Sequence, residues 1–265
     1  MNRILAAVLF LAATPAFAAD DLDEHGGIRV REWFARMSGT IEADAGTGLS
    51  TRIDLASDLA LGSRNLTHEI QAYAGIPLIG RIYAGWWEAE DSGSRALSRT
   101  IEFAGQTYPV TTQINSSATL DVFYLDYEFA FPAIPLGDLC QLEFALQAGA
   151  RGLRGEGSIN APSIPGSNAS HAGWVGFPTL GGHVTASLFS CVRAELEVLG
   201  MAFSYGSDRM SYLEAFAEVV AQPLPWVFIG VGYKYANLKI QHLGTSIFDF
   251  EVRVDGIYLT AGLRF

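Results

Sequence analysis

The sequence predicts an all-β fold in which about ten antiparallel strands (about eight to twelve are compatible) close into a barrel that spans a membrane. Three observations lead to this fold class. In the last stretch, apolar residues from Ile257 to Phe265 occupy every second position, which places them on one face of a strand. The chain is 49% hydrophobic with a mean hydropathy of +0.22, yet past the first residues it has no unbroken apolar run approaching the ~20 residues of a transmembrane helix. Short and long connections alternate between the strand-like segments, as in membrane barrels.

The first residues have the pattern of an export signal. A short basic start, Met1-Asn2-Arg3, precedes the apolar run Ile4–Ala13, and Ala16-Phe17-Ala18 fits a signal-peptidase site. The prediction is a signal peptide over 1–18 that is cleaved after Ala18. Residues 19–27 are then expected to form a periplasmic lead-in, and residues 28–265 to form the barrel.

The predicted strands follow from alternation along the chain. In the first strand, Trp33–Ala43, the apolar Trp33 and Ala35 alternate with Glu32 and Arg36, so the apolar set is expected to face lipid and the charged set the lumen. The further predicted strands are Glu69–Ile76, Arg81–Glu88, Val122–Phe131, Gln141–Arg151, Thr179–Ser190, Val192–Ser204, Met210–Gln222, Trp226–Lys239 and Phe248–Phe265.

The connections predict which end of the barrel faces which compartment. Tight turns near Pro77, Pro132, Cys191 and Pro223 are typical of the periplasmic end, where both termini are expected. Longer polar segments are expected at the outer end. They are Gly46–Asn65, whose stretch Thr51–Leu61 has no assigned role, the hairpin tip Asp91–Ser117, and Gly155–Gly173, predicted to be a mobile exposed loop.

A soluble β-sandwich or a lipocalin-like barrel would show the same alternation, with the apolar faces turned to a core. Periodicity alone does not separate the two alternatives. The export signal, the alternation of loop lengths and the aromatic end at Phe265 together favour the membrane barrel.

The last strand, which ends in Phe265, resembles the terminal strand of bacterial outer-membrane β-barrel proteins, where the final residue is typically aromatic. The resemblance implies an assembly signal at Tyr258, Leu263 and Phe265 that is read by the barrel-assembly machinery. It also implies a location in the outer membrane of a Gram-negative bacterium, in contact with outer-membrane lipid and lipopolysaccharide. No specific named family is matched, so no functional residues are carried over. The net charge of −11 argues against nucleic acid as a partner.

The alternation of apolar and polar residues changes phase within the terminal strand. Phe248, Phe250 and Val254 occupy even positions, whereas the apolar residues from Ile257 onward are odd. We expect a β-bulge at Asp255-Gly256, where glycine would allow it, with only Ile257–Phe265 embedded in the membrane. The strand is expected to pair with the first strand and so close the barrel.

The two cysteines are predicted to lie at the same rim of the barrel. Cys140 opens one predicted strand and Cys191 lies in a nearby turn. In an oxidising compartment the sequence is compatible with either a disulfide between them or two free thiols. Two cysteines without further ligands make a poor metal site, and neither a metal nor a cofactor is expected.

The lumen is predicted to hold a network of charged side chains. Neutralisation by pairing is the expected arrangement in a barrel of this width, and a narrow passage for small solutes is the alternative. The expected lumen-facing charged residues are Glu32, Arg36, Glu69, Arg81, Asp126, Glu128, Glu143, Arg151, Arg193, Glu195, Glu197, Glu214, Glu218 and Lys234.

A hydrolytic site is the second alternative. His183, Thr185 and Ser187 share one strand face, so a hydroxyl could lie beside an imidazole. The spacing His-x-Ser expected of a lipid A deacylase is absent, because Thr185 stands there, and no acid is marked as a third member. The sequence therefore predicts a non-enzymatic barrel with a structural or surface-interaction role.

Overall fold

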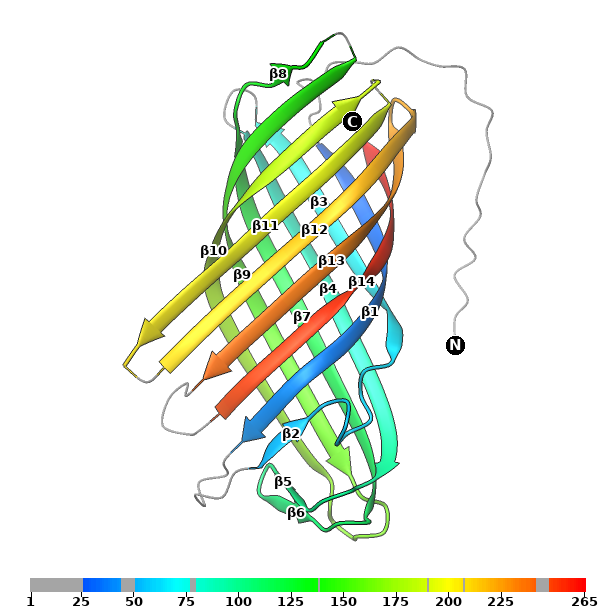
Figure 1. The fold of residues 1–265 in the computed structure, drawn as a ribbon, viewed down its shortest axis with the longest axis vertical. Helices are drawn as coiled ribbons and strands as arrows, with labels where there is room; N and C mark the ends of the chain where they lie inside the picture. The colour runs from blue at the N-terminus through cyan, green and yellow to red at the C-terminus, as the bar shows by residue number, and fades with distance from the viewer. Residues whose placement is uncertain are drawn as a thin grey trace.

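The computed structural model describes residues 26–43, 51–76, 80–137, 139–189, 191–206, 208–241 and 248–265. Ten long antiparallel strands wind into a closed, strongly tilted barrel (Figure 1). The predicted fold class is therefore confirmed. Within the described ranges no helix is long and apolar enough to cross a membrane. The predicted signal peptide 1–18 and nearly all of the predicted lead-in 19–27 lie outside the described residues; Gly26 already belongs to the first strand.

Ten strands form the wall and four short ones lie at its ends. The wall strands are β1 (Gly26–Ala43), β3 (Arg64–Ile76), β4 (Gly80–Ala96), β7 (Gln113–Ala130), β9 (Cys140–Asn160), β10 (Ala169–Leu188), β11 (Val192–Tyr205), β12 (Asp208–Leu224), β13 (Val227–Gln241) and β14 (Phe248–Arg264). The short strands are β2 (Arg52–Asp54), β5 (Ile101–Phe103), β6 (Gln106–Tyr108) and β8 (Ile134–Pro135).

The barrel closes between the first and last strands, as predicted. β1 pairs with β14 from Gly27 opposite Arg264 to Ala43 opposite Phe248. The register runs unbroken past Gly256, so the predicted β-bulge is wrong. Val254 points inward and Ile257 outward on one regular strand. The apolar residues change face because the lumen itself becomes apolar in that half of the barrel.

The two ends of the barrel differ in their connections. At the end that carries Gly26 and Phe265 most connections are tight, apart from the β7–β9 segment that contains β8 (Figure 1). At the opposite end most connections are longer, although only two residues separate β11 from β12. The predicted mobile loop Gly155–Gly173 is wrong over most of its length, because β9 continues to Asn160 and β10 begins at Ala169. The predicted hairpin tip Asp91–Ser117 contains the ends of β4 and β7 and, between them, the hairpin of β5 and β6.

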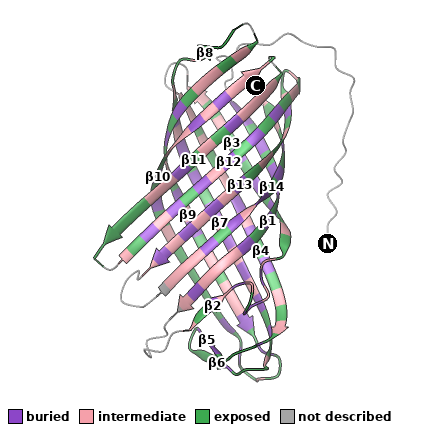
Figure 2. Cartoon of the chain, viewed as in Figure 1, coloured by how far each residue is buried: buried purple, intermediate pink, exposed green. Residues whose placement is uncertain are grey.

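Side chains alternate between a covered inner face and an open outer face on each wall strand (Figure 2). On β12, Glu214 and Glu218 are buried inside, whereas Leu213 and Val219 are 44% and 52% exposed on the outside. Exposed apolar side chains on neighbouring strands repeat this pattern around the wall. The outside is therefore a continuous apolar band of the kind that lipid solvates.

Cys140 and Cys191 lie at the same rim, as predicted, but both are free thiols. Cys140 is opposite Leu188 in the β9–β10 register, and Cys191 lies three residues further along the turn. The possible disulfide is therefore not formed in this structure.

Candidate functional site

The lumen is the candidate site, and β1 shows how its lining is specified. Arg29 and Arg31 point inward and are buried, while Ile28 and Val30, which alternate with them, are exposed outside. The same parity places Trp33, Ala35 and Met37 inside. The predicted orientation of β1 is therefore wrong.

Glu32 and Arg36, which we expected in the lumen, lie on the outer face instead. The Nδ1 atom of His68 is 2.8 Å from Oε2 of Glu32, and this pair is largely exposed. The error arose because β1 has apolar residues on both faces, outside in its first half and inside in its second. The run Ile28-Arg29-Val30-Arg31 held the signal that would have given the correct parity.

A lysine lies at the centre of the charged lining. The ammonium of Lys234 on β13 donates to Glu69 Oε2 at 2.9 Å and lies 2.8 Å from Glu214 Oε1. Lys234 is only 1% exposed. The same ammonium stands 5.4 Å and 5.3 Å from the ring centres of Trp33 and Trp87, so one cation is shared by two carboxylates and two aromatic faces.

Two arginines complete the charge balance around Lys234. Arg31 donates to Glu69 Oε1 at 2.8 Å, and its guanidinium lies 4.8 Å from the ring centre of Phe216. Arg151 donates to Asp126 at 2.5 Å and to Glu214 at 3.3 Å. These contacts join β1, β3, β7, β9, β12 and β13 across the lumen. The carboxylates that lipid would not tolerate are thereby paired, as expected for a filled barrel.

A second group of charges lies nearer the termini. Arg29 donates to Glu195 at 3.3 Å and to Glu218 at 3.4 Å. Arg81 donates to Glu128 and Glu143, each at 3.2 Å. A polar cavity of about 40 Å³ lies among these side chains. That volume is large enough for one or two water molecules.

His183 lies beside this cavity and is 8% exposed. Its Nδ1 is 2.8 Å from Glu128 Oε2, and its Nε2 is 3.4 Å from Thr185 Oγ1 and 4.0 Å from Glu195. Glu128 is thus the acid that the sequence did not mark. A carboxylate faces Nδ1, and the Thr185 hydroxyl and the more distant Glu195 face Nε2, so the imidazole bridges acidic groups of different strands inside the lumen.

The structure places most of the predicted lumen residues inside the barrel. Only Glu32 and Arg36 lie outside, and Arg29 and Arg31 were missed. The inward-facing members of the predicted set are Glu69, Arg81, Asp126, Glu128, Glu143, Arg151, Arg193, Glu195, Glu197, Glu214, Glu218 and Lys234. Of the residues predicted as an assembly signal, Tyr258 is buried in the lumen, while Leu263 and Phe265 are exposed on the outside.

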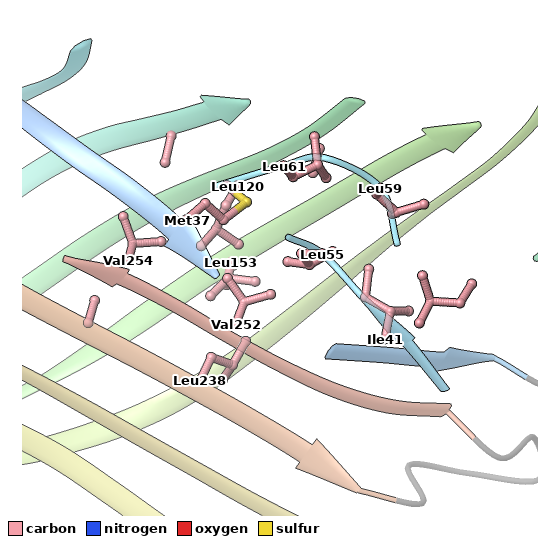
Figure 3. Packing of buried hydrophobic residues seen from close by; sticks show 14 of the residues in the cluster. Met37, Ile41, Leu55, Leu59, Leu61, Leu120, Leu153, Leu238, Val252 and Val254 are labelled. Atoms are coloured by element: carbon pink, nitrogen blue, oxygen red, sulfur yellow. The ribbon is translucent and has the colours of Figure 1, made fainter. Parts of the chain in front are cut away.

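The unassigned stretch Thr51–Leu61 is a plug. We use this name for residues 53–61, which fold back from β2 into the outer mouth of the barrel. Leu55, Leu59 and Leu61 are buried there against an apolar lining that includes Met37 and Val252 (Figure 3). The half of the lumen away from the termini is thus packed with apolar side chains, the plug leucines among them, and the half nearer the termini with paired charges.

Polar contacts hold the plug in place. The carboxylate of Asp91 on β4 accepts hydrogen bonds from the backbone N–H of Gly62 and from the hydroxyl of Ser63, the latter at 2.6 Å. At the far side Arg99 donates to both oxygens of Asp58, at 3.2 Å and 2.6 Å. The plug is therefore fixed to the wall and to the β4–β7 connection at separate points.

The structure combines an apolar outer band, a charged lumen and mostly short turns at one end of the barrel. This is the architecture of an outer-membrane β-barrel. No protein-family model matches the chain, and no curated protein matches it.

Several solved structures are similar in outline. They include the outer-membrane protease OmpT from Escherichia coli (11% identity, 92% of this chain and 97% of that one, TM-score 0.49). The attachment invasion locus protein Ail of Yersinia pestis is another (12% identity, 91% and 99%, TM-score 0.34). The toluene transporter TodX of P. putida is a third (8% identity, 93% and 91%, TM-score 0.33).

Replacing Lys234 by methionine tests the charged lining. Glu69 and Glu214 would each lose the cation that they share, and breaking a buried pair from one side costs about 3–5 kcal/mol. We expect the urea midpoint of the barrel in detergent to fall accordingly. Lys239→Met is the matched control, because Lys239 forms an exposed pair with Glu251 at 3.4 Å and should cost about 0–1 kcal/mol. Equal losses in the two variants would contradict the role of Lys234.

Acid should release the plug. Burial raises the pKa of Asp58, but its hydrogen bonds from Arg99 and from the backbone of Asp54 outweigh this, so its pKa lies below the usual value. The stabilisation is complete above the unfolded pKa of about 3.9 and is lost as pH falls through the lower folded pKa. Hydrogen exchange of residues 53–61, corrected for intrinsic rates, should accelerate below about pH 4. Asp58→Asn should remove this dependence; a parallel loss in both proteins would contradict it.

Proposed function

We propose that the protein is an integral outer-membrane barrel with a closed lumen and a structural or surface-interaction role. The observation that carries this proposal is the double filling of the lumen. The Lys234 cluster fills one half, and the leucines of the plug fill the other. After signal-peptide cleavage the protein would reside in the outer membrane of a Gram-negative bacterium. The assembly machinery would read its C-terminal strand, and outer-membrane lipid and lipopolysaccharide would surround it.

The outer ends of three neighbouring strands support a surface role. On β4, β7 and β9 the outer face changes from apolar to polar after Trp86, Phe123 and Gly152. The wall then continues for several more residues in each strand, which makes a rigid polar collar beyond the apolar band. The outward-facing collar residues are Glu88, Glu90, Ser92, Ser117, Thr119, Asp121, Arg154, Glu156 and Ser158. A regular sheet holds such side chains in a fixed pattern, which suits contact with a partner.

A closed lumen should give no conductance. Purified barrel inserted in a planar bilayer is expected to show no reproducible single-channel steps. Replacing residues 53–61 by a glycine–serine linker is the informative companion variant, and it should also be silent because the charged half still blocks the lumen. Reproducible steps from the unaltered protein would support the alternative, a narrow channel for small solutes that passes the cavity beside His183.

We also propose that the barrel is not an enzyme. The grouping of Glu128, His183 and Thr185 is the strongest hydrolytic candidate, and its imidazole lies between carboxylates. Expression in a Gram-negative host should leave the acyl chains of lipid A unchanged, as judged by mass spectrometry. Loss of an acyl chain with the unaltered protein, but not with His183→Ala, would establish the lipid-modifying alternative.

A further inference from the structure

Two arginines stand directly opposite one another on the outside of the barrel. Arg36 on β1 pairs in register with Arg64 on β3, and both side chains are exposed. One step nearer the termini on the same outer face, Phe34 is opposite Leu66, and these are 48% and 51% exposed. The two arginines thus follow the last apolar pair on this face, and the exposed Glu32–His68 pair lies on the other side of that apolar pair.

Neither arginine has an ionic partner among the described residues. On its other side, Arg36 is opposite Asp255 of β14. That carboxylate is already engaged, since it accepts hydrogen bonds from Arg253 at 2.8 Å and from the hydroxyl of Tyr233 at 2.6 Å. Like charges directly opposite on paired strands are destabilising. Arg36 and Arg64 therefore form a local positive charge on a chain whose net charge is −11. A bound anion would relieve the repulsion between them.

We propose that Arg36 and Arg64 bind the phosphate groups of outer-leaflet lipids. This inference rests on the proposed placement in an outer membrane. Guanidinium groups bind phosphate with two parallel hydrogen bonds, and headgroup phosphates lie where the hydrocarbon core ends. The acyl chains of the same lipid would lie over Phe34 and Leu66. The pair thus fixes a lipid headgroup at the β1–β3 seam, beside the closure of the barrel.

The test uses the full barrel in a zwitterionic detergent, with diphosphorylated lipid A and its dephosphorylated analogue as probes. Native mass spectrometry should show that the phosphorylated form binds the unaltered protein more tightly. The variant with Arg36→Gln and Arg64→Gln should bind it about 10- to 30-fold more weakly, since each basic residue at such a surface contributes about a factor of five to six. Arg154→Gln is the matched control, because Arg154 is also outward and exposed but is paired with Glu156 at 3.1 Å.

A stability measurement provides the second readout. Without phosphorylated lipid, the double glutamine variant should be at least as stable as the unaltered barrel, because the repulsion between the two arginines has been removed. With that lipid, the unaltered barrel should gain stability and the variant should not.

Three outcomes would overturn the proposal. They are equal binding of the two lipid A forms, an equal loss of affinity with Arg154→Gln, and binding of inorganic phosphate as tight as that of phosphorylated lipid A. Conductance by the unaltered barrel would contradict the closed lumen while leaving this lipid site intact, so the two failures are distinguishable.

Discussion

Charge pairing across the lumen is the constraint on which the rest of the barrel depends. A strand that presents apolar residues to lipid turns every other side chain inward, and ten strands enclose too little space to hydrate those side chains freely. Lys234, with Glu69 and Glu214, shows the solution. The cations Arg29, Arg31, Arg151 and Lys234 each pair with carboxylates that come from other strands. The network therefore ties the wall together.

The position of the plug follows from where this pairing ends. Beyond Trp33 and Trp87 the inner face becomes apolar, with Met37, Leu120 and Val252 buried there. An apolar lining with no filling would be either dry and empty or wetted at a cost of free energy. Leu55, Leu59 and Leu61 remove that cost. The Asx turn at Asp54, which accepts hydrogen bonds from Ala56 and Ser57 at 3.0 Å and 2.7 Å, shapes the segment so that its leucines reach the lining.

The sequence was sufficient for the strand number, the closure of β1 on β14 and most of the charged lining, because each depends on local alternation and chain order. It was insufficient where the environment of a face changes along one strand. On β1, apolar residues mark the outside at Ile28 and the inside at Met37, and a single rule for the apolar face fails there. The change of phase in the alternation near Gly256 has the same origin. The plug could not be predicted from the sequence for a different reason. Its leucines contact residues of strands that are distant in the sequence, and local alternation carries no information about such contacts.

The two fillings of the lumen differ in how they could change. The plug is held by hydrogen bonds of Asp58 and Asp91 and by its three buried leucines, and most of its residues belong to no wall strand. The charged lining is made of wall side chains, and displacing Lys234 or Arg151 leaves carboxylates without a counter-ion in a confined space. Movement of the plug alone would expose an apolar vestibule with a charged floor, open only to the outside.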